Sequence, residues 1–197
     1  MAVARLQPAT STDDTGGDED LFAVIKARSF RKGHHILSSG DVSDHYFDLK
    51  TTMMSPRGAT LWAEAFLRRV EPAVDYIGGL EMGAVPIVGS IAVLADLRRL
   101  PLRTFFVRKK AKGHGTEKLI EGLTTDETLQ GKRVWVVDDV ATKGASLMQA
   151  VDAVRGEGAA VDTALVLLDR EEGAEELLRQ NGVRLVSIFR GREFLQS

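Results

Sequence analysis

The chain has 197 residues, of which 44% are hydrophobic and 27% are charged; this length suits one well-buried domain and is short for two. Its 26 basic and 28 acidic residues give a formal net charge of -2, which argues against a protein that binds nucleic acid or a membrane surface. There is no cysteine, so disulfides, thiolate metal ligands and cysteine catalysis are excluded. No segment is long and apolar enough to cross a bilayer, and we expect a cytoplasmic protein.

The N-terminal part is expected to form a tail and a small accessory layer. Residues 1–20 are polar and acidic and lack apolar periodicity, which is typical of a flexible tail. A single domain is then expected over residues 21–197. Its first part, about residues 21–55, should form an antiparallel layer with a helix at 21–27 and strands at 36–37 and 46–49, the strands being separated by a turn at 38–41.

The rest of the domain, about residues 56–197, alternates apolar strands with amphipathic helices. The pattern predicts helices at 55–70, 86–100, 146–155 and 174–180, and strands at 74–78, 103–107, 133–137, 163–168 and 184–188. Such alternation indicates an α/β fold with a mainly parallel sheet flanked by helices on both faces.

An acidic pair follows one of these strands. Asp138 and Asp139 come directly after the apolar run 134–137 and precede a loop of small residues that leads into a helix. Backbone N–H groups of such a loop can wrap a phosphate, and the carboxylates can face ribose hydroxyls or a metal, which favours a sugar-phosphate site. Thr142, Gly144 and Ser146 add hydroxyl donors and close backbone approach. The alternative is an acidic pair that caps a helix or binds a structural cation.

A basic, glycine-bearing stretch at residues 108–118 interrupts the alternation. Arg108, Lys109, Lys110 and Lys112 lie close together and would repel one another unless an anion such as pyrophosphate neutralised them. Long loops inside compact domains are often lids, and the glycines beside His114 suit a loop that closes over a ligand. We interpret the stretch as a mobile cover; a solvated surface loop is the alternative.

Three further residues are candidates for ligand contact. Arg170 follows Asp169 at the predicted carboxyl end of a strand, where ligands of open α/β sheets gather, although a surface ion pair with Asp169 or Glu171 is equally consistent with the sequence. Tyr46 and Phe47 could stack on a planar ring. Adjacent strand residues point to opposite faces, however, so at least one of the two should pack in the core.

Four separated stretches resemble the orotate phosphoribosyltransferase family, and the resemblance extends over most of the chain from about Ser38 onward. The segment VWVVDDVATKGAS at residues 134–146 matches the signature of type I phosphoribosyltransferases that binds phosphoribosyl pyrophosphate (PRPP), and RKKAKGHG at 108–115 resembles the catalytic lid of the orotate branch. Ser39-Gly40 with residues 43–50 is similar to the branch's N-terminal hood, and LDRE at 168–171, followed by Glu172, matches its L-D-R-x-E pattern.

The resemblance implies a type I phosphoribosyltransferase fold with a small N-terminal antiparallel hood, and an enzyme that transfers the 5-phosphoribosyl group from PRPP to orotate. Magnesium is implied, held mainly through PRPP rather than in a dedicated protein cage. A homodimer is implied too, with lid residues acting across the interface. The implied catalytic residues are Lys112, Asp138 and Asp139; the implied PRPP-binding residues are Arg108, Lys109, Lys112, His114, Asp138, Asp139, Val140, Ala141, Thr142, Lys143, Gly144, Ala145 and Ser146; and the implied orotate-binding residues are Thr142, Arg170 and Phe47.

The chain departs from the family pattern in places. Residues 40–43 lack a Lys that several members carry, and another Lys found in some members is missing near Gly83. The rival functions are a purine phosphoribosyltransferase, a non-catalytic regulator that senses PRPP or binds RNA, and a receiver or nucleotide hydrolase with paired aspartates. The last lacks support because no G-x-x-x-x-G-K-[ST] loop occurs in the chain.

Overall fold

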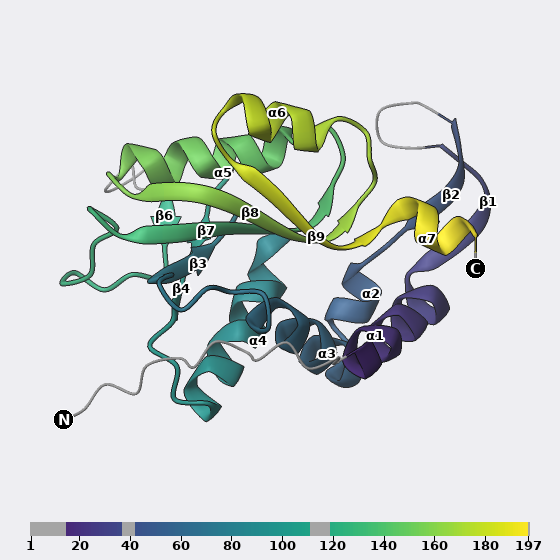
Figure 1. The fold of residues 1–197 in the computed structure, drawn as a ribbon, viewed down its shortest axis with the longest axis horizontal. Helices are drawn as coiled ribbons and strands as arrows, with labels where there is room; N and C mark the ends of the chain where they lie inside the picture. Colours follow the sequence, from purple (N-terminus) through teal and green to yellow (C-terminus); the bar gives the residue numbers. More distant parts are fainter. Residues whose placement is uncertain (1–14, 37–41, 111–118, 197) are drawn as a thin grey trace.

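The computed structural model describes residues 15–36, 42–110 and 119–196. A five-stranded sheet forms its centre (Figure 1), with all neighbouring strands parallel and the strand order β4-β3-β7-β8-β9. The predicted α/β class with a mainly parallel sheet is confirmed. The strands are β3 Tyr76–Gly78, β4 Arg103–Thr104, β7 Arg133–Ala141, β8 Ala160–Asp169 and β9 Arg184–Arg190.

Helices cover both faces of this sheet (Figure 1). α5 (Ala145–Gly156) and α6 (Ala174–Gln180) lie on one face, and α1 (Thr15–Arg28), α3 (Pro56–Leu67) and α4 (Ala84–Leu97) lie on the other. Local sequence explains where helices begin: Ser55 caps α3 by accepting a hydrogen bond of 3.2 Å from the Gly58 amide, and Pro56 occupies the first helical turn. The apolar stripe of α5 is fully buried, as its spacing of three and four predicts.

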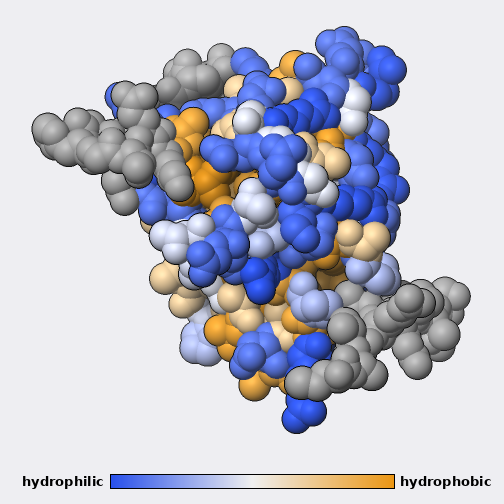
Figure 2. All heavy atoms as spheres, turned by 90° about the vertical axis from the view of Figure 1, so that its left-hand side faces the viewer, coloured by the Kyte–Doolittle hydropathy of each residue, from blue (hydrophilic) through white to orange (hydrophobic). Residues whose placement is uncertain are grey.

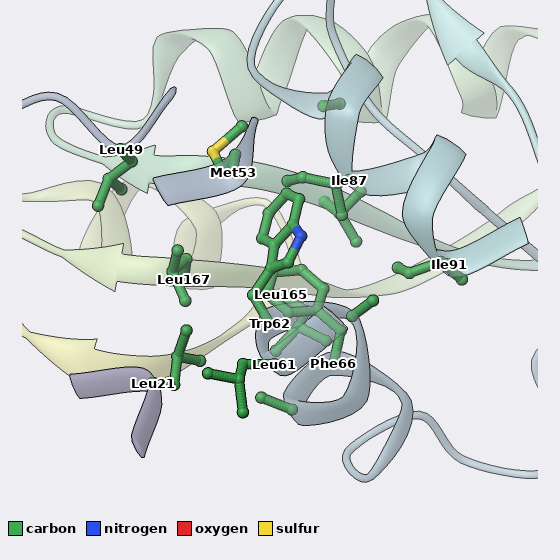
Figure 3. Packing of buried hydrophobic residues seen from close by; sticks show 14 of the residues in the cluster. Leu21, Leu49, Met53, Leu61, Trp62, Phe66, Ile87, Ile91, Leu165 and Leu167 are labelled. Atoms are coloured by element: carbon green, nitrogen blue, oxygen red, sulfur yellow. The ribbon is translucent and has the colours of Figure 1, made fainter. Parts of the chain in front are cut away.

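The sheet is buried on both sides, which is why its strands read as continuous apolar runs. Trp135 and Val137 of β7 join the hydrophobic cluster below the sheet, whereas Val134 and Val136 join the cluster above it. In the lower cluster the Trp62 and Phe66 rings of α3 pack edge to face with centroids 5.5 Å apart. Figure 3 shows the residues packed around them, among them Ile87, Ile91, Leu165 and Leu167.

An antiparallel hairpin beside the sheet forms the predicted hood. β1 (Phe30–Ile36) pairs with β2 (Val42–Phe47), and the short helix α2 (Lys50–Met53) follows. A C-terminal helix that was not predicted, α7 (Gly191–Leu195), lies next to the hairpin (Figure 1). Its Phe194 ring stacks on Phe22 at 4.2 Å and meets Phe47 edge-on at 5.3 Å, so aromatic packing fastens the hood to the sheet domain.

Several predicted boundaries are wrong. The hood strands predicted at 36–37 and 46–49 span residues 30–36 and 42–47, and the turn predicted at 38–41 lies outside the described residues. Helix α1 begins at Thr15, so residues 15–20 are not part of a flexible tail. Asp18 forms ion pairs of 2.5 Å with Arg68 and 2.7 Å with Arg69, and an acidic side chain in the first turn also suits the helix dipole. The strand predicted at 103–107 is divided at Phe105: β4 extends the parallel sheet, while β5 (Phe106–Val107) pairs antiparallel with β6 (Ile120–Glu121).

The described surface is mainly hydrophilic. Figure 2 views the molecule from the side on which β4, β6 and part of α4 lie, and shows hydrophobic side chains scattered among hydrophilic ones, as is usual for a folded protein. Within the described ranges, no helix has the length and apolarity that crossing a membrane requires.

Candidate active site at the carboxyl edge of the sheet

The acidic pair lies near the carboxyl end of β7, the middle strand of the sheet. Both side chains are buried, with 6% of Asp138 and 8% of Asp139 exposed. Ser146, in the first turn of α5, donates its hydroxyl hydrogen to Oδ2 of Asp138 at 3.1 Å. Oδ1 of Asp138 accepts from the Asp139 amide, and Oδ1 of Asp139 accepts from the Val140 amide, each at 2.9 Å. The two carboxylates are therefore fixed by their own strand and by α5.

The electrostatics of the pair are unusual. Burial raises the pKa of Asp138 most, the charge of Asp139 raises it further, and the two effects together bring it to about 7. The hydrogen bond from Ser146 opposes this rise because it stabilises the charged form. Near neutral pH Asp138 is therefore partly protonated, and a ligand that donates hydrogen bonds to it would favour its charged form.

The loop between β7 and α5 presents free backbone donors. Gly144 takes the left-handed conformation, with φ of 84°, that glycine adopts without strain. The loop is anchored from outside: the Arg170 amide donates to the Ala141 carbonyl at 2.9 Å, and the Ala174 amide donates to the Thr142 carbonyl at 3.0 Å. The amides of residues 143–146 form no hydrogen bond with any described residue, as expected at a helix start. They are available to an anion.

A pocket of about 310 Å³ opens at this edge of the sheet. The volume of this pocket does not distinguish it, since hollows of about 350 and 420 Å³ lie elsewhere on the described surface. The residues that line the pocket do distinguish it, because they combine the buried acidic pair, loop hydroxyls and cationic side chains. The lining residues are Lys50, Leu80, Glu81, Met82, Gly83, Lys109, Asp138, Asp139, Val140, Thr142 and Ser146.

The structure brings together only part of the predicted site. Six of its predicted members line the pocket: Lys109, Asp138, Asp139, Val140, Thr142 and Ser146. Ala141, Lys143, Gly144 and Ala145 belong to the same strand-loop-helix unit but are not among the lining residues; Ala141 and Gly144 are buried, and Lys143 and Ala145 are exposed. Lys112 and His114 lie outside the described residues.

The remaining predicted residues, Arg108, Arg170 and Phe47, do not line the pocket. Arg108 is at the base of the basic loop, where its amide donates to the Leu119 carbonyl at 2.8 Å and its guanidinium is 3.9 Å from Glu121. Arg170 pairs at 2.8 Å with Glu172, rather than with the neighbours considered from sequence. The prediction that Tyr46 or Phe47 packs in the core is confirmed: the Phe47 ring packs 5.0 Å from Phe30, and Tyr46 is exposed.

Sequence reasoning missed the second wall of the pocket, residues 80–83, together with Lys50. Residues 80–83 follow β3 and carry no recognisable chemical motif. The one signal that could have found them is topological, because the carboxyl ends of adjacent parallel strands meet at one edge. Gly83 is required there: a Cβ atom on it would collide with Oδ1 of Asp138 and lie 2.8 Å from Oδ1 of Asp139.

Comparison with known proteins agrees with this geometry. Residues 57–185 match the phosphoribosyl transferase domain family. An orotate phosphoribosyltransferase of a Bradyrhizobium species is 50% identical over 176 residues, which cover 89% of this chain and 95% of the relative. The chain belongs to the orotate phosphoribosyltransferase family.

Solved structures give the same assignment. The crystal structure of orotate phosphoribosyltransferase from Aeropyrum pernix has a TM-score of 0.71 at 34% identity, over 91% of this chain and 96% of that one. The Mycobacterium tuberculosis enzyme in complex with PRPP has a TM-score of 0.69 at 25% identity, over 91% of this chain and 92% of that one. The expected type I phosphoribosyltransferase fold is confirmed, and the protein is a transferase.

The close contact at Gly83 predicts that Gly83→Ala lowers phosphoribosyl transfer by at least about tenfold, because the added methyl group must displace the acidic pair. Steady-state assays test this. Gly89→Ala in α4 is the matched control, since a Cβ there meets nothing within 4 Å, and it should retain full activity. Equal activity of the two variants would contradict the inferred contact.

The raised pKa of Asp138 predicts a pH-dependent gain in stability for Asp138→Asn. Folding holds the Asp138 proton more tightly than the unfolded chain does, so the stability of the wild type falls as pH rises from 3.8 towards about 7. Asparagine removes that loss. Thermal unfolding without ligand should show a rise in Tm of several degrees at pH 8, at about 2–4 °C per kcal/mol for a chain of this size, and a smaller rise at pH 5. The exposed Asp126→Asn is the control, and equal gains at both pH values would refute the assignment.

Proposed function

We propose that this protein transfers the 5-phosphoribosyl group of PRPP to N1 of orotate, giving orotidine 5'-monophosphate and pyrophosphate in de novo pyrimidine (UMP) biosynthesis. The observation that carries the proposal is one pocket at the carboxyl edge of the sheet, in which a buried acidic pair, the loop residues Thr142 and Ser146 and a lysine meet, beside the free amides of the same loop. These groups match the hydroxyls and the phosphates of an activated ribose.

The loop after β7 would bind the 5-phosphate. Its free amides at residues 143–146 and the positive end of α5 favour a dianion. Thr142 and Ser146 supply hydroxyl donors beside them, and Gly144 lets the backbone approach the phosphate closely. Asp138 and Asp139 would accept hydrogen bonds from the two ribose hydroxyls, which fixes the ring between the loop and the other wall of the pocket.

The main electrostatic demand of the reaction is the leaving group. As the bond between C1 and the pyrophosphate oxygen breaks, the sugar becomes an oxocarbenium-like cation and negative charge collects on the diphosphate. We assign Arg108, Lys109, Lys112 and His114 to that charge. Lys109 lines the pocket, and cations fixed in advance stabilise developing charge without reorganisation. Exclusion of water by the basic loop would prevent hydrolysis of the activated sugar.

Magnesium is proposed as the cofactor. The pocket offers carboxylate oxygens from Asp138 and Asp139, the hard donors that Mg²⁺ prefers, and Mg²⁺ is commonly held by one or two carboxylates together with substrate phosphates. When bound, the ion would neutralise charge on the diphosphate. Arg108, Lys109 and Lys112 would share that task from the protein side.

The orotate end is assigned to Arg170, Thr142 and Phe47. Arg170 is held at the phosphate loop by its backbone bond to Ala141, and its planar guanidinium suits a carboxylate or a carbonyl edge. Its ε nitrogen is buried and has no hydrogen-bond partner in the described part of the chain, which is costly unless a ligand completes the site. Phe47 would contribute ring contact from the hood.

We also propose a homodimer in which the basic loop of one subunit acts on the site of its partner. The support is the family resemblance of residues 108–115 to a lid of that kind. The cytoplasmic location expected from the cysteine-free composition stays a prediction.

A substrate panel tests the reaction. With PRPP and Mg²⁺, orotate should be converted at least about a hundredfold more efficiently than adenine, guanine or uracil, because only orotate offers a carboxylate to Arg170. Release of pyrophosphate, read by a coupled assay, measures each rate. Faster conversion of a purine base would overturn the assignment of orotate, and PRPP binding without turnover on any base would favour a regulatory protein.

Mixed dimers test the sharing of sites. Lys112→Ala and Asp139→Asn should each be nearly inactive alone, and their mixture should recover about a quarter of wild-type activity, because half of the dimers are mixed and each has one intact site. The control is a double variant in which both subunits of every dimer carry Lys112→Ala and Asp139→Asn. Absence of recovery in mixtures that contain mixed dimers would mean that each loop serves its own subunit.

A further inference from the structure

The backbone of Lys109 is held from two sides by side chains that have no assigned role. Its amide donates to Oε1 of Glu81 at 2.9 Å, and its carbonyl accepts from Nε2 of Gln149 at 3.1 Å. Glu81 follows β3, and Gln149 belongs to α5. The residue that begins the basic loop is therefore attached to both walls of the pocket.

Gln149 lies where it can couple two parts of the site. It is three residues after Ser146 on α5, so the two side chains emerge from the same side of the helix. Ser146 holds Asp138, and Gln149 holds the Lys109 carbonyl. One helical turn thus fixes the acidic pair and the position of a pocket-lining cation at the same time.

The contact is specific rather than part of a ladder. Arg108, immediately before Lys109, is bonded to the Leu119 carbonyl at 2.8 Å, which closes the β5-β6 pair. The backbone of Lys109 itself has two polar contacts with the described residues, its amide donating to Glu81 and its carbonyl accepting from Gln149. Because Gln149 is exposed, its amide would otherwise be solvated by water, and little of the fold depends on it.

We propose that Gln149 is a positioning residue for Lys109. Together with Glu81, which binds the other side of the Lys109 backbone, it holds the Lys109 ammonium group beside the diphosphate of PRPP. This inference rests on the proposed function. Gln149 acts through the Lys109 carbonyl and is assigned no contact with substrate. Its removal therefore weakens the use of PRPP and leaves the use of orotate and the fold unchanged.

A double-mutant cycle tests the proposal. Gln149→Met keeps the side-chain length and removes the donor, and it should lower kcat/KM for PRPP by about three- to tenfold, the range that one ordinary hydrogen bond supports. KM for orotate should not change. In a Lys109→Ala background the same substitution should change kcat/KM by less than about twofold, the limit of independent effects.

Matched controls separate the outcomes. Gln180→Met also removes an amide donor, from a 2.8 Å bond to Glu176 on α6, and should leave kcat/KM for PRPP unchanged. A full effect of Gln149→Met that persists without the Lys109 side chain, or no effect in the wild-type background, would overturn the proposal. Failure of the proposed function is distinct, because the wild type itself would then fail to convert PRPP and orotate.

Discussion

The burial of two adjacent carboxylates at the end of the central strand is the constraint on which the site depends. Removing Asp138 and Asp139 from water costs free energy, and their mutual repulsion adds to the cost. The protein offsets this cost with the Ser146 hydroxyl and with amides of the strand itself. It also keeps position 83 free of a side chain, because the loop after β3 passes directly over the pair.

This arrangement divides the pocket electrostatically. In the proposed binding mode the acidic pair repels phosphate and attracts hydroxyl hydrogens, so a sugar phosphate would enter with its ring hydroxyls towards β7. Its anionic ends would then face the amides of the loop and the cations of the other wall. Lys50 and Lys109 come from the hood and from the basic loop, not from the central strands. Lys50 and Lys109 are exposed at this edge, whereas the two carboxylates are buried and accept fixed hydrogen bonds from Ser146 and from amides of their own strand.

What the sequence predicted well is local in origin. The unit from β7 to α5 could be predicted because its apolar run, acidic pair, small-residue loop and helical periodicity are contiguous. α6 was predicted with its observed bounds for the same reason: Gly173 precedes it, and its apolar positions recur at helical spacing.

The errors come from contacts between segments distant in sequence. The start of α1 depends on the ion pairs of Asp18 with Arg68 and Arg69. No pattern within residues 15–20 predicts these ion pairs. α7 depends on the aromatic partners of Phe194, and the break at Phe105 depends on which strand lies beside each half. In the site, residues 80–83 were missed because their roles come from where the fold places them: Gly83 leaves room for the acidic pair, and the Glu81 carboxylate meets the distant Lys109 amide.

The two ends of the proposed substrates are positioned by different kinds of structure, and their chemistry explains why. The β7-β8 ladder sets the distance from the phosphate loop to Arg170, since it pairs Ala141 with Asp169 and the next residue bonds back to the loop. The 5-phosphate and the base must keep their relative geometry while C1 leaves the pyrophosphate oxygen and bonds to N1 of orotate. A ladder of many hydrogen bonds maintains that geometry. The diphosphate must instead enter and leave. Among its proposed ligands, Lys109 is attached to the pocket by two single hydrogen bonds, one from its amide to Glu81 and one from Gln149 to its carbonyl, which can break at modest cost.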